Sequence, residues 1–268
     1  MRAAKFANAV YPHANTVICI EDGKLLKQFQ YDILYNTKRL QSALDELNNI
    51  NYFHTYKNAD ADNYGVMLDG LMTATFDLMK EIAPTDLIWR IFALYYDIHN
   101  MKLAVKEKFF NKRLDSLVLE YGSYSLPTIR SAAVRKSDNI LNDETLTDGF
   151  FEALHAKDMY DIDFILDKTY FRTLKKLAGK FEIPEMTEFV VERIDLFNVS
   201  AFFQSMAAEK PNGYFCRAFS EEGSFPLNEW QKYIDGTGNS AIENFSLWQK
   251  YRSVWENTDD KKQLFLEL

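Results

Sequence analysis

Residues 120–126 read Glu-Tyr-Gly-Ser-Tyr-Ser-Leu, and residues 221–227 read Glu-Glu-Gly-Ser-Phe-Pro-Leu. Both stretches follow the pattern Glu-x-Gly-Ser-aromatic-x-Leu, and residues 21–23, Glu-Asp-Gly, begin in the same way. The three glycines recur at intervals of about 100 residues and are Gly23, Gly122 and Gly223. This spacing predicts a repeated supersecondary unit, which is more typical of a shaped surface or ring than of a single reaction centre.

A second repeated motif, Asp-x-x-Asn-apolar, lies upstream of each longer loop. Asp97 and Asn100 form its first copy, and Asp195 and Asn198 form its second. A carboxylate and an amide one helical turn apart suit acid–base chemistry or ligand binding, but they also suit hydrogen bonds to the backbone of a neighbouring loop. The duplication favours the structural role, because an active site seldom needs two copies.

The composition indicates an all-α fold. The chain has 268 residues, of which 47% are hydrophobic, so a full core is possible in one large domain or two. Glycine and proline are few, and the prolines stand at apparent breaks between apolar stretches with helical periodicity. We predict helices near residues 21–49, 66–81, 86–113, 126–139, 144–157, 161–180 and 185–208.

The repeats divide the chain into three units. The first helical unit is predicted over residues 1–119 and the second over residues 120–220. Residues 221–268 would form a truncated third unit, because the chain ends less than half a repeat after Gly223.

The net charge of −8 and the pI of about 5.2 give the chain as a whole no electrostatic attraction to nucleic acid or to an anionic bilayer. One local run is basic. It is either a solvated helix face or a docking patch for an acidic partner, and it comprises Lys102, Lys106, Lys108, Lys112 and Arg113.

Known catalytic and metal-binding motifs are missing from the sequence. It has neither a GxxxxGK[ST] loop nor a GxGxxG loop, and its four histidines stand outside any HExxH or triad-like context. Cys19 and Cys216 lack a CxxC partner, and we expect both to be small buried hydrophobes. We therefore predict no catalytic residue, metal or cofactor. Without a signal peptide or a long apolar run, we also expect a soluble or peripheral protein.

Residues 94–102, Leu-Tyr-Tyr-Asp-Ile-His-Asn-Met-Lys, continuing to Lys106, resemble the Asp-x-x-Asn-apolar-Lys helix of the C subunit of V/A-type rotary ATPases, which is called the d subunit in the eukaryotic enzyme. Residues 11–34 resemble the opening segment of that family. The stretches 162–171 and 194–198 are similar to its second unit. The order and spacing of these motifs carry the resemblance.

The resemblance implies an all-helical funnel of three related units around a pseudo-threefold axis. Such a body caps the membrane rotor (proteolipid) ring and forms the socket for the central stalk subunits, as a peripheral part of the complex at the cytoplasmic face of the membrane. It carries torque between ion movement and ATP synthesis or hydrolysis, without binding nucleotide or catalysing a reaction itself. The missing nucleotide motif agrees with that role.

The sequence departs from the family pattern at its C-terminal end, where relatives close with a third full unit. Here residues 242–252 lead into a divergent acidic tail, so we interpret the chain as a short form with an incomplete third unit. Two other functions stay open at this point. One is an unrelated helical-repeat adaptor, and the other is an all-helical enzyme whose central pocket would need convergent ionisable groups with shifted pKa values.

Overall fold

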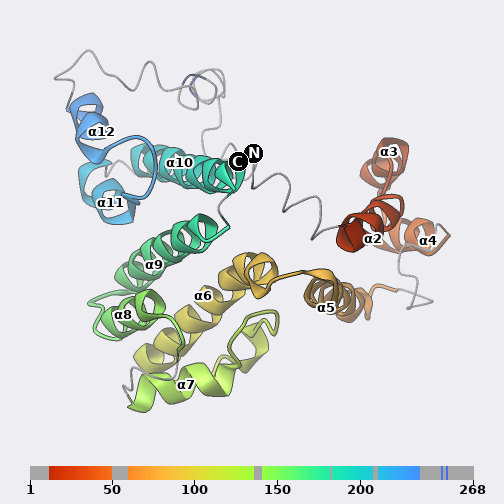
Figure 1. The fold of residues 1–268 in the computed structure, drawn as a ribbon, viewed down its shortest axis with the longest axis horizontal. Helices are drawn as coiled ribbons and strands as arrows, with labels where there is room; N and C mark the ends of the chain where they lie inside the picture. Colours follow the sequence, from red (N-terminus) through yellow and green to blue (C-terminus); the bar gives the residue numbers. More distant parts are fainter. Residues whose placement is uncertain are drawn as a thin grey trace. The chain divides into compact units, whose positions relative to one another are not determined.

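The computed structural model describes residues 12–49, 60–135, 141–181, 183–207 and 211–235, together with positions 249 and 252. Every regular element in these ranges is a helix, which confirms the predicted all-α class (Figure 1). The chain divides into two compact units, Met1–Arg90 and Ile91–Leu268, and each is described by itself. The predicted division into three units stays a prediction, and most of the proposed third unit lies outside the described residues.

In its described residues, 12–49 and 60–90, the first unit contains four helices and the start of a fifth. They are α2 (Pro12–Asp22), α3 (Gln28–Asn36), α4 (Leu40–Asn49), α5 (Tyr64–Ile82) and the first turn of α6 (Asp86–Phe110). Few of its described side chains are buried, and α3 buries none. The apolar ones that are buried are Ala14, Leu44, Met67 and Phe76.

The prediction of one helix over residues 21–49 is wrong, because the chain breaks twice in that range. Gly23 follows the end of α2 and donates its backbone N–H to the Cys19 carbonyl at 3.3 Å. Thr37 ends α3 in an extended conformation, and its hydroxyl donates to the Ile33 carbonyl at 2.8 Å. The apolar periodicity continues through both breaks, which is why the sequence pattern hides them.

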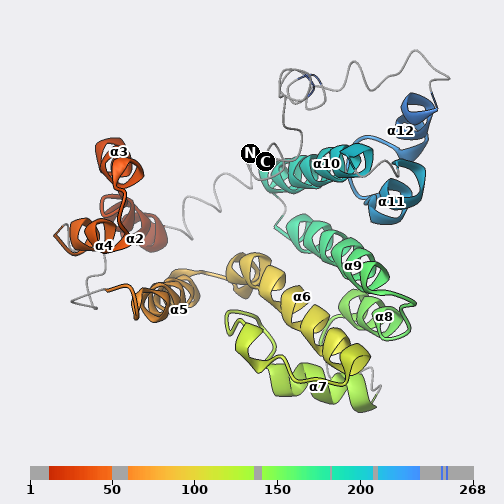
Figure 2. The ribbon, with the colours of Figure 1, turned by 180° about the vertical axis from the view of Figure 1, so that it is seen from behind.

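The second unit contains the rest of α6 and the remaining helices. They are η1 (Asp115–Leu117), α7 (Leu126–Arg135), α8 (Glu144–Ala153), α9 (Met159–Gly179), α10 (Pro184–Ala207), α11 (Pro211–Ala218) and α12 (Leu227–Ile234). Each helix predicted from residue 66 onward is confirmed where the structure describes it, with most ends shifted by a few residues. Positions 136–139 and 208 of these predictions lie outside the described residues. Helix α9 packs against α8, α10 and α11, and α12 packs against α11 (Figures 1 and 2).

Aromatic side chains form the core that joins α10, α11 and α12. The Trp230 ring lies 5.0 Å from the Phe202 ring and 5.3 Å from the Phe215 ring, measured between centroids. All three side chains are fully buried. Large aromatic groups contribute most of the apolar area in such a cluster, so it fixes the three helices relative to one another.

Two further sequence expectations meet the structure here. Cys19 is exposed and Cys216 is only half-buried, so the expectation that both are buried hydrophobes is wrong. Within the described ranges, no helix combines the length and the hydropathy that crossing a membrane requires.

Candidate functional site

Helix α6 holds the loop that follows it through the first Asp-x-x-Asn pair. The Asn100 amide donates to the Leu119 carbonyl at 2.7 Å and accepts from the Leu119 N–H at 3.2 Å. Asp97 accepts from the Tyr124 N–H at 3.0 Å. Both side chains are only 1% exposed. We call this arrangement the first clasp, formed by Asp97 and Asn100 with the loop 119–124.

Helix α10 repeats the arrangement with the second pair. The Asn198 amide donates to the Ser220 carbonyl at 2.9 Å and accepts from the Ser220 N–H at 2.9 Å. Asp195 accepts from the Ser224 N–H at 2.8 Å and from the Ser224 hydroxyl at 2.5 Å. This second clasp consists of Asp195 and Asn198 with the loop 220–225.

The two clasps keep the same register relative to the repeated glycine. In each, the asparagine pairs in both directions with the residue three positions before that glycine. In each, a backbone N–H of the aromatic position, Tyr124 or Phe225, also reaches the aspartate. The sequence repeat is therefore a repeat of hydrogen-bond geometry.

The glycines of these two loops lie directly against the aspartates. A Cβ atom built on Gly122 would contact Asp97 Oδ1, and one built on Gly223 would contact Asp195 Oδ1, both at less than van der Waals distance. Neither glycine has a left-handed φ, so space and not backbone conformation requires glycine there. Gly23 is different, because a Cβ there would meet only carbonyl oxygens of α2.

The second clasp is a buried polar site in which burial is the largest influence on the pKa of the Asp195 carboxyl. Burial raises the pKa of Asp195, and the Ser224 hydroxyl and N–H oppose that rise by donating to the carboxylate. The Asn198 amide forms both of its hydrogen bonds described above with the Ser220 backbone. Because buried polar groups need such partners, the geometry positions a loop and presents no converging set of catalytic groups.

The basic run of α6 is divided by the structure into two parts. Lys102 donates to Asp167 at 2.7 Å, and Lys106 donates to Asp163 at 2.8 Å. These pairs are half-buried and link α6 to α9. Burial raises the pKa of Asp167, and the ammonium of Lys102 opposes that rise. Lys102 and Lys106 are thus engaged within the chain.

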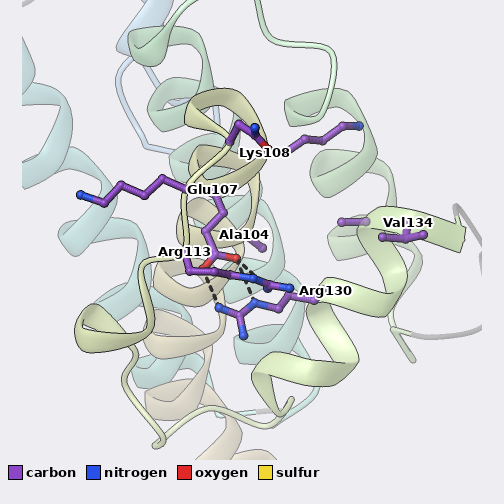
Figure 3. Close-up of a pocket in the computed structure, with 9 residues that line it drawn as sticks. Ala104, Glu107, Lys108, Arg113, Arg130 and Val134 are labelled. Atoms are coloured by element: carbon purple, nitrogen blue, oxygen red, sulfur yellow. Dashed lines mark hydrogen bonds and ion pairs between the residues drawn. The ribbon is translucent and has the colours of Figure 1, made fainter.

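The other three residues of the run, Lys108, Lys112 and Arg113, surround a hollow of about 630 Å³ at the C-terminal end of α6 (Figure 3). Helix α7 provides its opposite wall. We call this hollow the basic pocket. Its lining consists of Ala104, Glu107, Lys108, Asn111, Lys112, Arg113, Arg130, Ala133 and Val134.

The end of α6 fixes where these cations stand. Asn111 adopts a left-handed conformation with φ 50°, and the Lys112 N–H donates to the Glu107 carbonyl at 3.1 Å. This is the hydrogen bond of a Schellman-type helix end, for which asparagine is a common substitute for glycine. The chain turns sharply there, so Lys112 and Arg113 leave the helix beside Lys108.

Glu107 and Arg130 form the floor of the basic pocket, where dashed lines join them in Figure 3. Glu107 is 8% exposed and receives two hydrogen bonds from Arg130, at 2.9 Å from Nε and 2.5 Å from a terminal nitrogen. The Leu114 N–H also donates to Glu107, at 2.8 Å. These donors, Arg130 first, lower the pKa of Glu107.

Sequence reasoning did not single out Glu107 or Arg130. The one available signal was an acidic residue inside a basic run, and nothing in the sequence places it against a residue of α7. Among the described residues, no group of three or more His, Cys, Asp and Glu side chains has the geometry of a metal site.

The fold and the clasps define an all-helical scaffold in which the same loop-to-helix hydrogen bonds occur twice. Residues 14–267 match the ATP synthase (C/AC39) subunit family, and the chain belongs to this family. The resemblance inferred from the motifs to the C subunit of V/A-type ATPases is confirmed by that match.

Three relatives are similar to most of this chain. The C subunit of the V-type sodium ATPase of Enterococcus hirae is 22% identical over 263 residues, which cover 96% of this chain and 79% of that protein. The C subunit of the A-type ATP synthase of Thermococcus kodakarensis is 24% identical over 204 residues, 70% of this chain and 55% of that protein. Its counterpart in Thermococcus onnurineus is 22% identical over 212 residues, 74% and 58% respectively. No solved structure is significantly similar to the chain.

Proposed function

We propose that this chain is the non-catalytic central-rotor subunit of a V/A-type ATPase that joins the membrane rotor ring to the central stalk. The observation that carries the proposal is the family match over residues 14–267. Its relatives are named as the C subunit of a sodium ATPase and of ATP synthases. In this role the chain transmits torque between ion movement through the ring and ATP synthesis or hydrolysis on the stalk side, from the cytoplasmic face of the membrane.

The proposed architecture is a funnel of three related units around a pseudo-threefold axis. The two clasps support it, because the same hydrogen bonds recur on α6 and α10 with the same register to Gly122 and Gly223. A torque-carrying body has to keep its loops fixed relative to its helices. On α6 and α10, buried asparagines and aspartates do this by bonding the backbone of the loops that follow.

The non-catalytic part of the proposal follows from the use of the polar groups. The four repeated Asp and Asn side chains bond the backbone of their own loops, and the buried Glu107 bonds Arg130 and Leu114. Neither arrangement leaves a pair of ionisable groups facing a reactant, which acid–base or nucleophilic catalysis requires.

The test is reconstitution of a V/A-type ATPase from which the C subunit has been omitted. Adding this chain should restore co-purification of the ring with the stalk and should make ATP turnover depend on ion movement. The matched control is the same preparation with the Asp195→Ala/Asn198→Ala variant, which loses the second clasp and should restore less coupling. A chain that binds neither ring nor stalk under any condition would refute the rotor assignment.

A further inference from the structure

We propose that the basic pocket receives an acidic, partly apolar segment of a partner protein, with a carboxylate held by Arg113 and neighbouring carboxylates held by Lys108 and Lys112. The inference rests on the proposed function in so far as the partner is another component of the same complex. It narrows the docking surface from the whole basic run to one end of α6.

The first support is charge that the chain itself does not neutralise. Among the described residues, the side-chain ammonium groups of Lys108 and Lys112 form neither a hydrogen bond nor an ion pair. In the same ranges, the Arg113 side chain has one ion-pair partner, Glu107 at 3.5 Å, and it is 68% exposed. Because Glu107 is already paired with Arg130, the pocket keeps the charge of three cations on a chain whose net charge is −8.

The contrast with Lys102 and Lys106 sharpens this point. Those two lysines come from the same run and the same helix, but each has an aspartate of α9 within 2.8 Å. Their charges are therefore neutralised by ion pairs that link α6 to α9. The one acidic residue that lines the hollow, Glu107, is paired with Arg130, so Lys108, Lys112 and Arg113 need a partner's acids to gain the energy of a charge-assisted hydrogen bond.

The second support is apolar surface at the same place. Val134, on the wall opposite the cations, is 84% exposed. Phe109 and Phe110, at the end of α6, are 51% and 54% exposed, and their rings pack edge to face. Protein interfaces are enriched in aromatic residues and arginine, so cations that precede and follow exposed phenyl rings in the chain fit a protein partner.

The third support concerns which anion fits. The pocket lies at the C-terminal end of α6, where the helix dipole places partial negative charge. A compact dianion such as phosphate is favoured at a helix N-terminus and disfavoured here. Single carboxylates on a peptide contact the ends of the long side chains and avoid the helix end. A nucleic acid or an anionic membrane is also disfavoured by the overall charge of −8.

An alternative explanation without a partner is that these cations only complement the dipole of α6. Lys108 in the last turn fits that role. The exposed Val134 on the facing helix and the paired phenyl rings have no part in it, and they are what the proposed partner segment would cover.

The binding test uses a labelled helical peptide with glutamate on one face and leucine on the other, and a matched peptide with glutamine replacing glutamate. We expect the intact chain to bind the glutamate peptide with an affinity that falls as salt rises, and to bind the glutamine peptide at least tenfold more weakly. The Lys108→Glu/Lys112→Glu/Arg113→Glu variant should lose binding at least tenfold. Val134→Glu should weaken binding more than Val134→Ala, because it places a carboxylate where the partner's own carboxylates approach.

The matched control reverses three exposed cations elsewhere in the second unit, Lys157, Arg172 and Lys180, for the same change in net charge. An equal loss in this control would overturn the proposal, because the attraction would be non-specific. Tighter binding of inorganic phosphate, or of vesicles containing anionic lipid, would overturn it in favour of another ligand. Thermal unfolding of every variant separates loss of binding from loss of fold.

The same variants in the reconstituted complex separate the two proposals. If the pocket variant neither binds the peptide nor assembles, while the control variant assembles, both proposals stand. If the pocket variant assembles and couples normally, the pocket proposal fails and the rotor assignment survives. If even the unaltered chain binds neither ring nor stalk, the rotor assignment fails, and peptide binding alone decides the pocket.

Discussion

Replacing Gly223 by alanine should destabilise the protein, although most glycine-to-alanine changes at such backbone angles do not. The added Cβ atom would lie within contact distance of Asp195 Oδ1 and 3.1 Å from Asn198 Nδ2. Asp195 is 4% exposed, so its carboxylate has little room to move aside. The clasp therefore has to open, or the loop has to shift away from α10.

The magnitude follows from the bonds that such a shift breaks. Asp195 accepts from the Ser224 N–H at 2.8 Å and from the Ser224 hydroxyl at 2.5 Å. Hydrogen bonds to a charged group contribute about 1.5–3 kcal/mol. Removing a glycine from the unfolded chain offsets about 0.4–1 kcal/mol of that loss. We expect a net loss of about 1–2 kcal/mol, which lowers the melting temperature by roughly 2–8 °C for a unit of this size.

The controls are Gly179→Ala in α9 and Gly213→Ala in α11. Nothing lies within 4 Å of a Cβ atom at either position. Both changes should leave the melting temperature equal or raise it, since alanine restricts the unfolded chain and favours the helix. The expected change in melting temperature is negative at Gly223 and zero or positive at the two control glycines. A general effect of introducing alanine therefore cannot produce this difference.

Chemical denaturation of the four proteins gives the free energies of unfolding directly. A double variant, Asp195→Ala/Gly223→Ala, tests the mechanism, because the alanine at 223 should cost less once the carboxylate is gone. If Gly223→Ala is as stable as Gly179→Ala, or if the two changes in the double variant are additive, contact with Asp195 is not what requires the glycine.

Four further outcomes are expected. Asp97→Ala and Asp195→Ala should each lower the free energy of unfolding by about 1–3 kcal/mol without removing a specific activity, and unchanged midpoints in denaturant would contradict this. Lys102→Gln/Lys106→Gln should destabilise the protein, because it removes two half-buried ion pairs to α9, whereas Lys108→Gln should not. Thermal scans of the variants at equal protein concentration compare the two effects. Because the Glu107 pKa is lowered in the folded protein, its carboxylate contributes stability above the ordinary pKa of 4.5, and this contribution is lost as pH falls through the lowered value. The stability difference between the intact protein and Glu107→Gln should therefore shrink on acidification, and a constant difference would count against the Arg130 pair. The purified chain should hydrolyse no ATP, and turnover that a point mutation in this chain abolishes would reverse the non-catalytic assignment.

The sequence was informative where a pattern and its physical cause are local. Helices α5 to α10 follow the apolar periodicity, and proline breaks such as the one at Pro184 mark their ends. The repeated Asp-x-x-Asn and Glu-x-Gly motifs were also visible, since the residues that form the same contacts occur twice in the sequence. Their meaning needed the fold, because nothing in the sequence tells which helix face meets which loop.

Sequence reasoning failed where the cause is not local. A break at Gly23 and another at Thr37 divide the predicted helix 21–49, although the apolar spacing runs through both. The five cations of the basic run looked equivalent, but their environments depend on α9, which supplies aspartates to Lys102 and Lys106 alone among these five. Likewise, Glu107 of α6 pairs with Arg130 of α7, which lies 23 positions further along the chain.

Helix α6 connects the two features to which function is assigned. It carries the first clasp at Asp97 and Asn100, and the basic pocket begins at its other end with Lys108. A helix rises about 1.5 Å per residue, so Asn100 and Lys108 lie roughly 12 Å apart along one continuous rod. Between them, Lys102 and Lys106 bind the rod to α9. Force applied to a partner segment in the pocket would therefore be transmitted to α9 and to the clasped loop through ion pairs and hydrogen bonds that are already formed in the free chain. This arrangement suits the proposed role of carrying torque, because the buried polar groups of α6 hold other parts of the chain and the cations at its end are left to meet a partner.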